Sequence, residues 1–177
     1  MTPDKLNIPH GLSIRPSTPA DRGFIENLFR TTRDDLRLID AEPDFIETLI
    51  EQQFNAQTTG YGDQFPNAMY FIIEKQGQPV GRLTIDFGSN EVRLVDIAFI
   101  PEARGKGYGE GVVNGLKLAA MQCRAPLALS VPSGNWRAKQ LYTRLGFKTE
   151  EIAPPFERMV WYPGSGRQGE GGNVQRK

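Results

Sequence analysis

Between residues 95 and 109 an apolar, strand-like run leads into a short cationic loop and then directly into a helical pattern. The loop reads Arg104-Gly105-Lys106-Gly107-Tyr108-Gly109. Glycines let the backbone adopt positive φ and approach a ligand closely, and successive N–H groups at the start of a helix attract anions. The two cations add charge at the same place. The segment therefore predicts a strand–loop–helix unit that binds a pyrophosphate.

Two better-known phosphate loops do not fit this segment. A dinucleotide-binding fingerprint has the spacing G-x-G-x-x-G and an acid about 20 residues later. Here the spacing is G-x-G-x-G, and Arg124 to Pro126 offer no acid. A P-loop has Ser or Thr after its Gly-Lys pair, whereas Gly107 follows Lys106. A flexible strand-to-helix connection without a ligand would explain the glycines but not the two cations.

The patterns on either side of this loop predict a layered α/β fold. Apolar residues recur at helical spacing after a Thr18-Pro19-Ala20-Asp21 helix start, and continuous apolar runs bounded by turn residues indicate strands. We expect helices from Thr18, at 43–54, 108–122 and 135–145, a loop at 60–66, and strands at 12–15, 69–74, 80–87, 92–100, 127–131, 147–152 and 156–161.

This pattern covers one domain, residues 12–162, which we expect to follow a flexible arm (1–11) and to precede a disordered tail (163–177). The tail is rich in glycine and charge and has almost nothing apolar, so it cannot bury enough surface to offset its ordering entropy.

Composition argues against several classes of function. The chain has 21 basic and 21 acidic residues, so it lacks the basic excess typical of nucleic-acid binders. No apolar run approaches the roughly 20 residues of a membrane-spanning helix. One histidine (His10) and one cysteine (Cys123) are too few for the usual zinc sites. We expect no metal, no nucleic acid, no membrane and no catalytic role for either residue. With no signal peptide in view, we expect a cytoplasmic protein.

A second motif strengthens the interpretation of the loop. Residues 135–147 read Asn-Trp-Arg-Ala-Lys-Gln-Leu-Tyr-Thr-Arg-Leu-Gly-Phe, which resembles N-x-x-A-x-x-L-Y-x-x-x-G-F, the second signature of the GNAT superfamily of N-acetyltransferases. Residues 104–109 are similar to the R/Q-x-x-G-x-G/A signature of the same family. The resemblance runs from about Leu12 to Trp161. It implies a mixed, mostly antiparallel central sheet, with helices on both faces and a splay between the strands before and after the glycine-loop helix.

The resemblance also implies acetyl-CoA as the co-substrate and direct acetyl transfer to an amine. By this resemblance, the backbone of Ile97, Ala98 and Phe99 would pair with the pantetheine arm. One N–H near Ala98 would lie at the thioester oxygen. The pyrophosphate would lie on the backbone and side chains of Arg104, Gly105, Lys106, Gly107, Tyr108 and Gly109. Asn135 would contact the coenzyme A arm, although asparagine is also a favoured N-cap and either role, or both, would explain it.

Two residues are candidates for proton transfer. By its motif position, Tyr142 would protonate the leaving thiolate and contact coenzyme A, because a phenol is protonated at neutral pH. It could instead be a core aromatic beside Leu141 and Leu145. Asp96, a charge in an apolar run, could act as base, bind a cationic substrate, or pair with Arg82 or Arg93. A water chain could equally carry the proton.

The acceptor is not specified by these motifs. We expect it between the first two helices and the last hairpin, with Tyr61, Phe65, Asp86 and Glu157 as candidates, and a small molecule rather than a protein. The alternatives are a coenzyme A-binding module without catalysis, a different acyl chain, and a protein lysine or N-terminal acetyltransferase. The fold is also compatible with a homodimer.

Deleting residues 163–177 should change neither the melting temperature nor the affinity for acetyl-CoA, because this segment offers no apolar anchor. Thermal unfolding with and without acetyl-CoA tests this. A large fall in melting temperature on truncation would show that the tail packs against a folded part.

Overall fold

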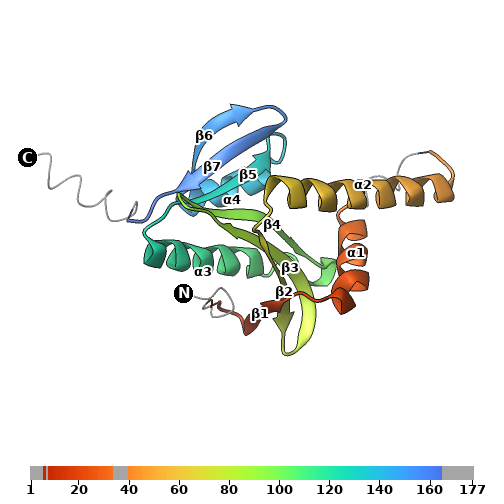
Figure 1. Ribbon diagram of the computed structural model, residues 1–177, viewed down its shortest axis with the longest axis horizontal. Helices are drawn as coiled ribbons and strands as arrows, with labels where there is room; N and C mark the ends of the chain where they lie inside the picture. The colour runs from red at the N-terminus through yellow and green to blue at the C-terminus, as the bar shows by residue number, and fades with distance from the viewer. Residues whose placement is uncertain (1–5, 7, 34–39, 165–177) are drawn as a thin grey trace, which may run out of the picture.

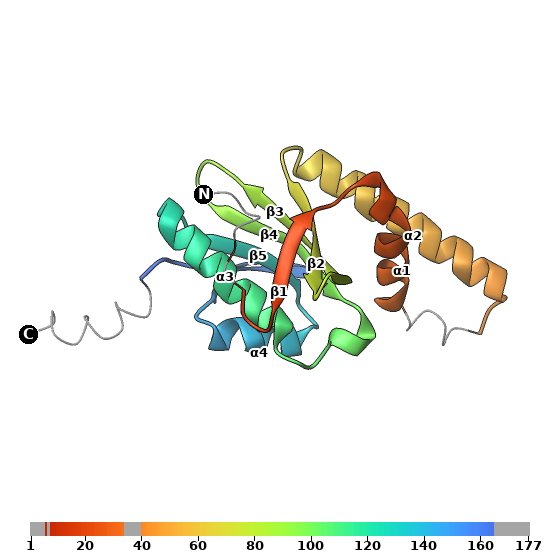
Figure 2. The same cartoon turned by 90° about the horizontal axis from the view of Figure 1, so that it is seen from below.

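A computed structural model describes residues 6, 8–33 and 40–164 as seven strands in one sheet, with helices on both faces (Figures 1 and 2). The strand order is β1-β2-β3-β4-β5-β7-β6. In chain order the elements are β1 (Leu12–Pro16), η2 (Pro19–Asp21), α1 (Arg22–Thr31), α2 (Pro43–Gln64), β2 (Met69–Lys75), β3 (Gln78–Phe87), β4 (Val92–Phe99), η4 (Pro101–Ala103), α3 (Tyr108–Cys123), β5 (Leu127–Pro132), α4 (Trp136–Arg144), β6 (Lys148–Ala153) and β7 (Phe156–Trp161). The predicted mixed, mostly antiparallel fold is confirmed.

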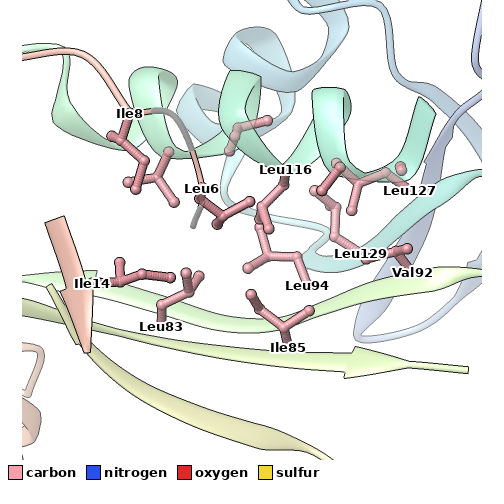
Figure 3. Close-up of a cluster of buried hydrophobic side chains, with 14 of the residues drawn as sticks. Leu6, Ile8, Ile14, Leu83, Ile85, Val92, Leu94, Leu116, Leu127 and Leu129 are labelled. Carbon is pink, nitrogen blue, oxygen red and sulfur yellow. The ribbon is translucent and has the colours of Figure 1, made fainter. Parts of the chain in front are cut away.

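The main core lies between the sheet and α3. Leu116 of α3 lies over Leu83, Ile85 and Leu94 from β3 and β4, together with Leu127 and Leu129 from β5 (Figure 3). These side chains are almost completely buried, and each contributes about 1.5–3 kcal/mol by leaving water. A second, smaller cluster joins α1 to α2 and consists of Phe29, Ile46, Ile50 and Phe54.

The feature of the sheet that matters most for a site is the short contact between β4 and β5. These parallel strands pair only where Val92, Arg93 and Leu94 lie opposite Leu127, Ala128 and Leu129. The β3–β4 register shifts at the same level, because Thr84 lies opposite Asp96 while Ile85 lies opposite Leu94. Val95 is therefore an extra residue, and such a bulge bends its strand. Beyond it β4 has no β5 partner, which is the splay that the sequence predicted.

The segment before β1 packs closely against α3. Leu6 and Ile8 are buried in the main core, and a Cβ on Gly111 of α3 would lie 2.9 Å from the Pro9 ring. Only glycine allows this approach. The packing of residues 6 and 8–11 differs from the loosely held arm expected from their polarity, because the alternating apolar pair Leu6 and Ile8 supplies an anchor.

Helix α2 is longer than its apolar pattern predicted. It continues to Gln64 and includes Gly60 and Gly62, so the loop expected at 60–66 is wrong for most of its length. Each glycine costs about 1 kcal/mol relative to alanine in a helix. Two aromatic side chains help to offset this cost. Phe54 is buried in the middle of α2, and Tyr61 is half-buried near its end.

The other departures are small. Several element ends shift by one or two residues from the expected bounds. Most of the tail expected to be disordered, residues 165–177, lies outside the described residues. None of the described helices combines the length and apolar character needed to cross a membrane.

The start of the first helical segment is fixed by Asp21, as its capping pattern predicted. The Asp21 carboxylate accepts the Thr18 N–H at 2.8 Å and both terminal nitrogens of Arg15 at 2.8 and 2.9 Å. These bonds, first that from Arg15 and then that from Thr18, hold the pKa of Asp21 well below its usual range.

Asp21→Asn should lower the melting temperature at pH 7 by about 2–4 °C, because losing such bonds costs about 1 kcal/mol. A carboxylate whose pKa falls on folding stabilises the protein above its ordinary pKa of about 4 and loses this effect as the pH falls below it. The difference in melting temperature between wild type and variant should therefore become smaller from pH 7 to pH 2.5 in thermal scans. An unchanged difference would contradict the ion-pair explanation.

Candidate active site

The splay leaves part of the β4 backbone facing an open gap. The Ile100 N–H donates to the Val80 carbonyl at 2.9 Å, so Ile100 faces β3. Backbone groups alternate direction along a strand, so the N–H and C=O of Ala98 also point at β3, whereas those of Ile97 and Phe99 point into the gap. An N–H at Ala98, expected at the thioester oxygen, is thus turned away. Ile97 and Phe99 offer the available donors.

The glycine loop leaves backbone N–H groups without helical partners at the start of α3. Gly105 and Gly107 have φ of 73° and 79°, which other residues adopt only with strain. The first bond of α3 joins the Gly111 N–H to the Gly107 carbonyl at 3.0 Å. The N–H groups of Tyr108 and Gly109 precede it and have no partner inside the helix. The backbone geometry fits the pyrophosphate site predicted from the sequence.

Two side chains of this loop serve the fold. Arg104 donates from Nε to the Phe99 carbonyl at 2.9 Å and from Nη2 to Thr31 Oγ1 at 2.9 Å. It therefore ties the loop to the end of β4 and to α1. The Tyr108 ring is buried, and its hydroxyl accepts Lys75 Nζ at 2.7 Å. The exposed Lys106 is the cation of the loop that remains unengaged in the described part of the chain.

His10 lies beside the same loop, although its sequence position did not predict this. Its ring centroid is 5.5 Å from that of Tyr108, and its Nε2 is 3.7 Å from the position of a Cβ on Gly107. His10 also has a positive φ of 69°, which is uncommon for a residue with a side chain. The signal that could have indicated this packing is the Leu6–Ile8 pair that anchors the segment.

On α4, which follows β5, Asn135 and Tyr142 take the places expected from the second motif. Asn135 is the N-cap, and its Oδ1 accepts the Ala138 N–H at 3.2 Å. Tyr142 is half-buried against Phe147, with ring centroids 5.6 Å apart. Burial, and secondly the negative charge of Asp96, raise the pKa of the Tyr142 phenol. The hydroxyl has no hydrogen-bond partner within residues 6, 8–33 and 40–164, so it is free to meet a ligand.

Asp96 is held by an ion pair. Arg82 Nε donates to Asp96 Oδ2 at 2.6 Å, and Arg82 Nη2 donates to Gln57 Oε1 of α2 at 2.6 Å. Both charged side chains are mostly buried, at 14% and 18% exposure. Of the pairings considered from the sequence, that with Arg82 is present, while Arg93 lies nearer Glu91 and Ser130.

A cavity of about 300 Å³ opens next to this ion pair, between the start of α1, the second half of α2, and strands β2 and β3. Of the four acceptor-site candidates, Tyr61 lines it. Burial, and then the charge of Asp96, raise the pKa of Tyr61 to about 12.

The other three candidates have different surroundings. Phe65 lies 5.6 Å beneath the Arg93 guanidinium, and Glu157 accepts Lys139 Nζ at 2.9 Å. Asp86, on β3, is opposite Arg93 and does not line the cavity. In the described part of the chain, no cluster of His, Cys, Asp and Glu could hold a metal ion.

Comparisons with known proteins agree with the fold. The model of the acetyltransferase (GNAT) family matches residues 25–147. An uncharacterized N-acetyltransferase of Methanocaldococcus jannaschii is 31% identical over 99 residues, which are 51% of this chain and 44% of that protein. The chain spans about half the length of the curated relatives it matches.

Solved structures share the architecture at low identity. The PaiA N-acetyltransferase of Thermoplasma acidophilum, in complex with coenzyme A, has a TM-score of 0.64 at 15% identity, covering 85% of this chain and 98% of that one. The spermidine N-acetyltransferase of Vibrio cholerae, in complex with CoA and spermine, has a TM-score of 0.59 at 19% identity, covering 88% and 97%.

Gly107→Val should abolish the stabilisation by acetyl-CoA, because a side chain there blocks backbone approach to the pyrophosphate. In the wild type, ligand at about 100 times its dissociation constant should add about 2.7 kcal/mol to the free energy of unfolding. Thermal scans with and without acetyl-CoA measure the effect.

Gly164→Val is the matched control for this variant. Gly164 has a φ of 81° in open space after β7, so a side chain there meets similar backbone strain away from the glycine loop. A full acetyl-CoA shift in Gly107→Val, or its loss in both variants, would contradict the assignment of the loop.

Proposed function

Because the chain belongs to the GNAT family of acetyltransferases, whose model matches residues 25–147, we propose that it transfers an acetyl group from acetyl-CoA directly to the amine of a small molecule. The observation that carries the proposal is the gap between β4 and β5. An anion site lies at one end of β4, and an unpartnered phenol on α4 follows β5. In net terms, an N–C bond forms, the thioester C–S bond breaks, and one amine proton ends on the sulfur.

The backbone would bind both ends of the co-substrate. The N–H groups at the start of α3, with the exposed Lys106, would hold the pyrophosphate. Ile97 and Phe99 would pair with the pantetheine amides in the gap, as an added strand pairs with a sheet edge. The N–H of one of these two residues, rather than that of Ala98, would stabilise the negative charge that develops on the thioester oxygen.

Tyr142 would act as the general acid. A phenol with a raised pKa is fully protonated near neutral pH and therefore always has a proton to donate. Ordinary thiols have a pKa of about 8.5, below that of a phenol, but burial in the gap disfavours a thiolate and raises its proton affinity. Donation from Tyr142 would then assist departure of the sulfur.

Asp96 would attract the acceptor amine. Its charge acts on both Tyr142 and Tyr61, so it lies in electrostatic reach of both sides of the site. Because Oδ2 already accepts from Arg82, the remaining acceptor capacity of the carboxylate would take an amine N–H. Tyr61, with a pKa of about 12, would not serve as a base, which leaves Asp96 or solvent to receive the proton.

The alternative of a binding module without catalysis is less consistent with Tyr142. Within the described residues the Tyr142 hydroxyl has no hydrogen-bond partner, and it is not one of their buried unsatisfied polar atoms, so it stays accessible to a ligand. A phenylalanine would serve packing against Phe147 equally well. The unpartnered phenol at the gap therefore favours an enzyme.

Tyr142→Phe should lower kcat by about 10²–10⁴-fold, the usual contribution of a positioned general acid, with little change in acetyl-CoA affinity. Free-thiol release from acetyl-CoA over a panel of amines measures the first quantity, and calorimetric titration with acetyl-CoA the second. If no amine stimulates thiol release from the wild type, the catalytic proposal is wrong.

Tyr162→Phe is the control. Its exposed hydroxyl bonds Glu150 at the end of β7, away from the gap, so this variant should retain wild-type kcat. A Tyr142→Phe variant with normal kcat and weakened acetyl-CoA binding would reassign Tyr142 as a binding residue.

A further inference from the structure

We propose that the cavity between α1, α2, β2 and β3 is the acceptor pocket, and that it takes an amine with an uncharged, largely apolar body and an anionic far end, rather than a polyamine. The inference rests on the proposed acetyl transfer and names its acceptor class.

The position of the cavity connects it to the gap. Arg82 and Thr84 of β3 line it. Thr84 lies opposite Asp96 in the β3–β4 register, and Arg82 is ion-paired with Asp96 at 2.6 Å. An acceptor in the cavity therefore meets β4 at the residue where the strand leaves β5. This places an amine at the inner end of the cavity next to the open backbone of Ile97.

The walls favour a flat or apolar body. Phe54 and Phe71 are buried at the base, and Tyr61 and Tyr70 line the sides. Tyr70 is 43% exposed although it is a large aromatic residue. Aromatic rings that stay accessible around a cavity of this size are typical of ligand pockets, where a few polar groups then fix the orientation.

The charges of the pocket disfavour polycations. None of the described residues that line it is an aspartate or a glutamate, whereas two are arginines. Arg82 is neutralised by Asp96. Arg22, the exposed first residue of α1, has no hydrogen bond or ion pair with any other described residue. One uncompensated positive charge therefore stands at the rim, where it would attract a carboxylate or phosphate and repel a second ammonium group.

The likeness to the spermidine N-acetyltransferase of Vibrio cholerae does not oppose this, because 19% identity shows the shared fold alone. Several ammonium groups in one pocket are costly to bury without carboxylates to pair them. Here none of the described lining residues is acidic, and Asp96, which pairs with the lining residue Arg82, already has a guanidinium partner.

Three amines on one scaffold test the proposal. They are 4-(aminomethyl)benzoate, 4-methylbenzylamine and 1,4-bis(aminomethyl)benzene, which share a ring and an aminomethyl group and differ in the far end: anionic, neutral or cationic. We expect KM to rise in that order, by about two- to thirtyfold between first and last, because the attraction of one exposed charge and the repulsion of the opposite charge each contribute about 0.2–1 kcal/mol. Calorimetric titration of each amine into the coenzyme A-saturated protein should give the same order without requiring turnover.

Arg22→Gln should remove most of the preference for the anionic probe and leave 4-methylbenzylamine unaffected. Arg124→Gln is the control, because Arg124 is an exposed cation at the far end of α3. Raising the salt concentration from 0.05 to 0.5 M should also reduce the difference in KM between the anionic and the cationic probe in the wild type. Thr58→Trp, which fills the cavity from α2, should abolish binding of all three amines without changing acetyl-CoA affinity.

The outcomes separate this inference from the proposed function. Preference for the dication or for spermidine, or an unchanged preference in Arg22→Gln, overturns the acceptor class. If Thr58→Trp binds the amines as well as the wild type does, or if the wild type binds none of the three, the cavity is not the acceptor pocket. In each case acetyl-CoA-dependent thiol release with another amine, and its dependence on Tyr142, would still decide the transfer activity.

Discussion

The loss of pairing between β4 and β5 beyond Leu94 and Leu129 is the constraint on which the rest of the site depends. A sheet normally satisfies the backbone groups of an inner strand on both sides. Here the bulge at Val95 turns β4 away, and the N–H groups of Ile97 and Phe99 face the gap without a partner strand, while the Phe99 carbonyl accepts from Arg104. Apart from the bulge, β4 stays paired with β3 as far as Phe99, so the open edge belongs to a strand that the sheet already holds on its other side.

A chain of polar contacts links this edge to the helices on the other face. Asp96 on β4 is paired with Arg82 on β3, which also donates to Gln57 on α2. Breaking such a mostly buried pair by removing one partner leaves an uncompensated charge, which is costly. The contacts therefore connect α2, which forms one wall of the cavity, to the strand that would hold the thioester.

The parts of this arrangement that the sequence predicted are those with a local signature. The glycine loop needs positive φ within a few residues, and Asn135 and Gly146 mark the two ends of α4 in the sequence itself. The direction of the Ala98 peptide groups was not predictable, because it depends on the register with Arg82 of β3, which lies 16 positions earlier. The same holds for Arg104, whose loop position indicated a ligand contact but whose partners come from β4 and α1. The length of α2 was also missed, since tertiary packing overrides the propensity of two glycines.

The contact of Pro9 with Gly111 gives the segment before β1 a mechanical role. Leu6 and Ile8 insert into the core beside α3, and His10 reaches the glycine that begins this helix. The segment thus covers the first turn of α3 and joins it to the sheet. Residues about a hundred positions earlier in the chain therefore take part in holding the end of α3 that follows the glycine loop.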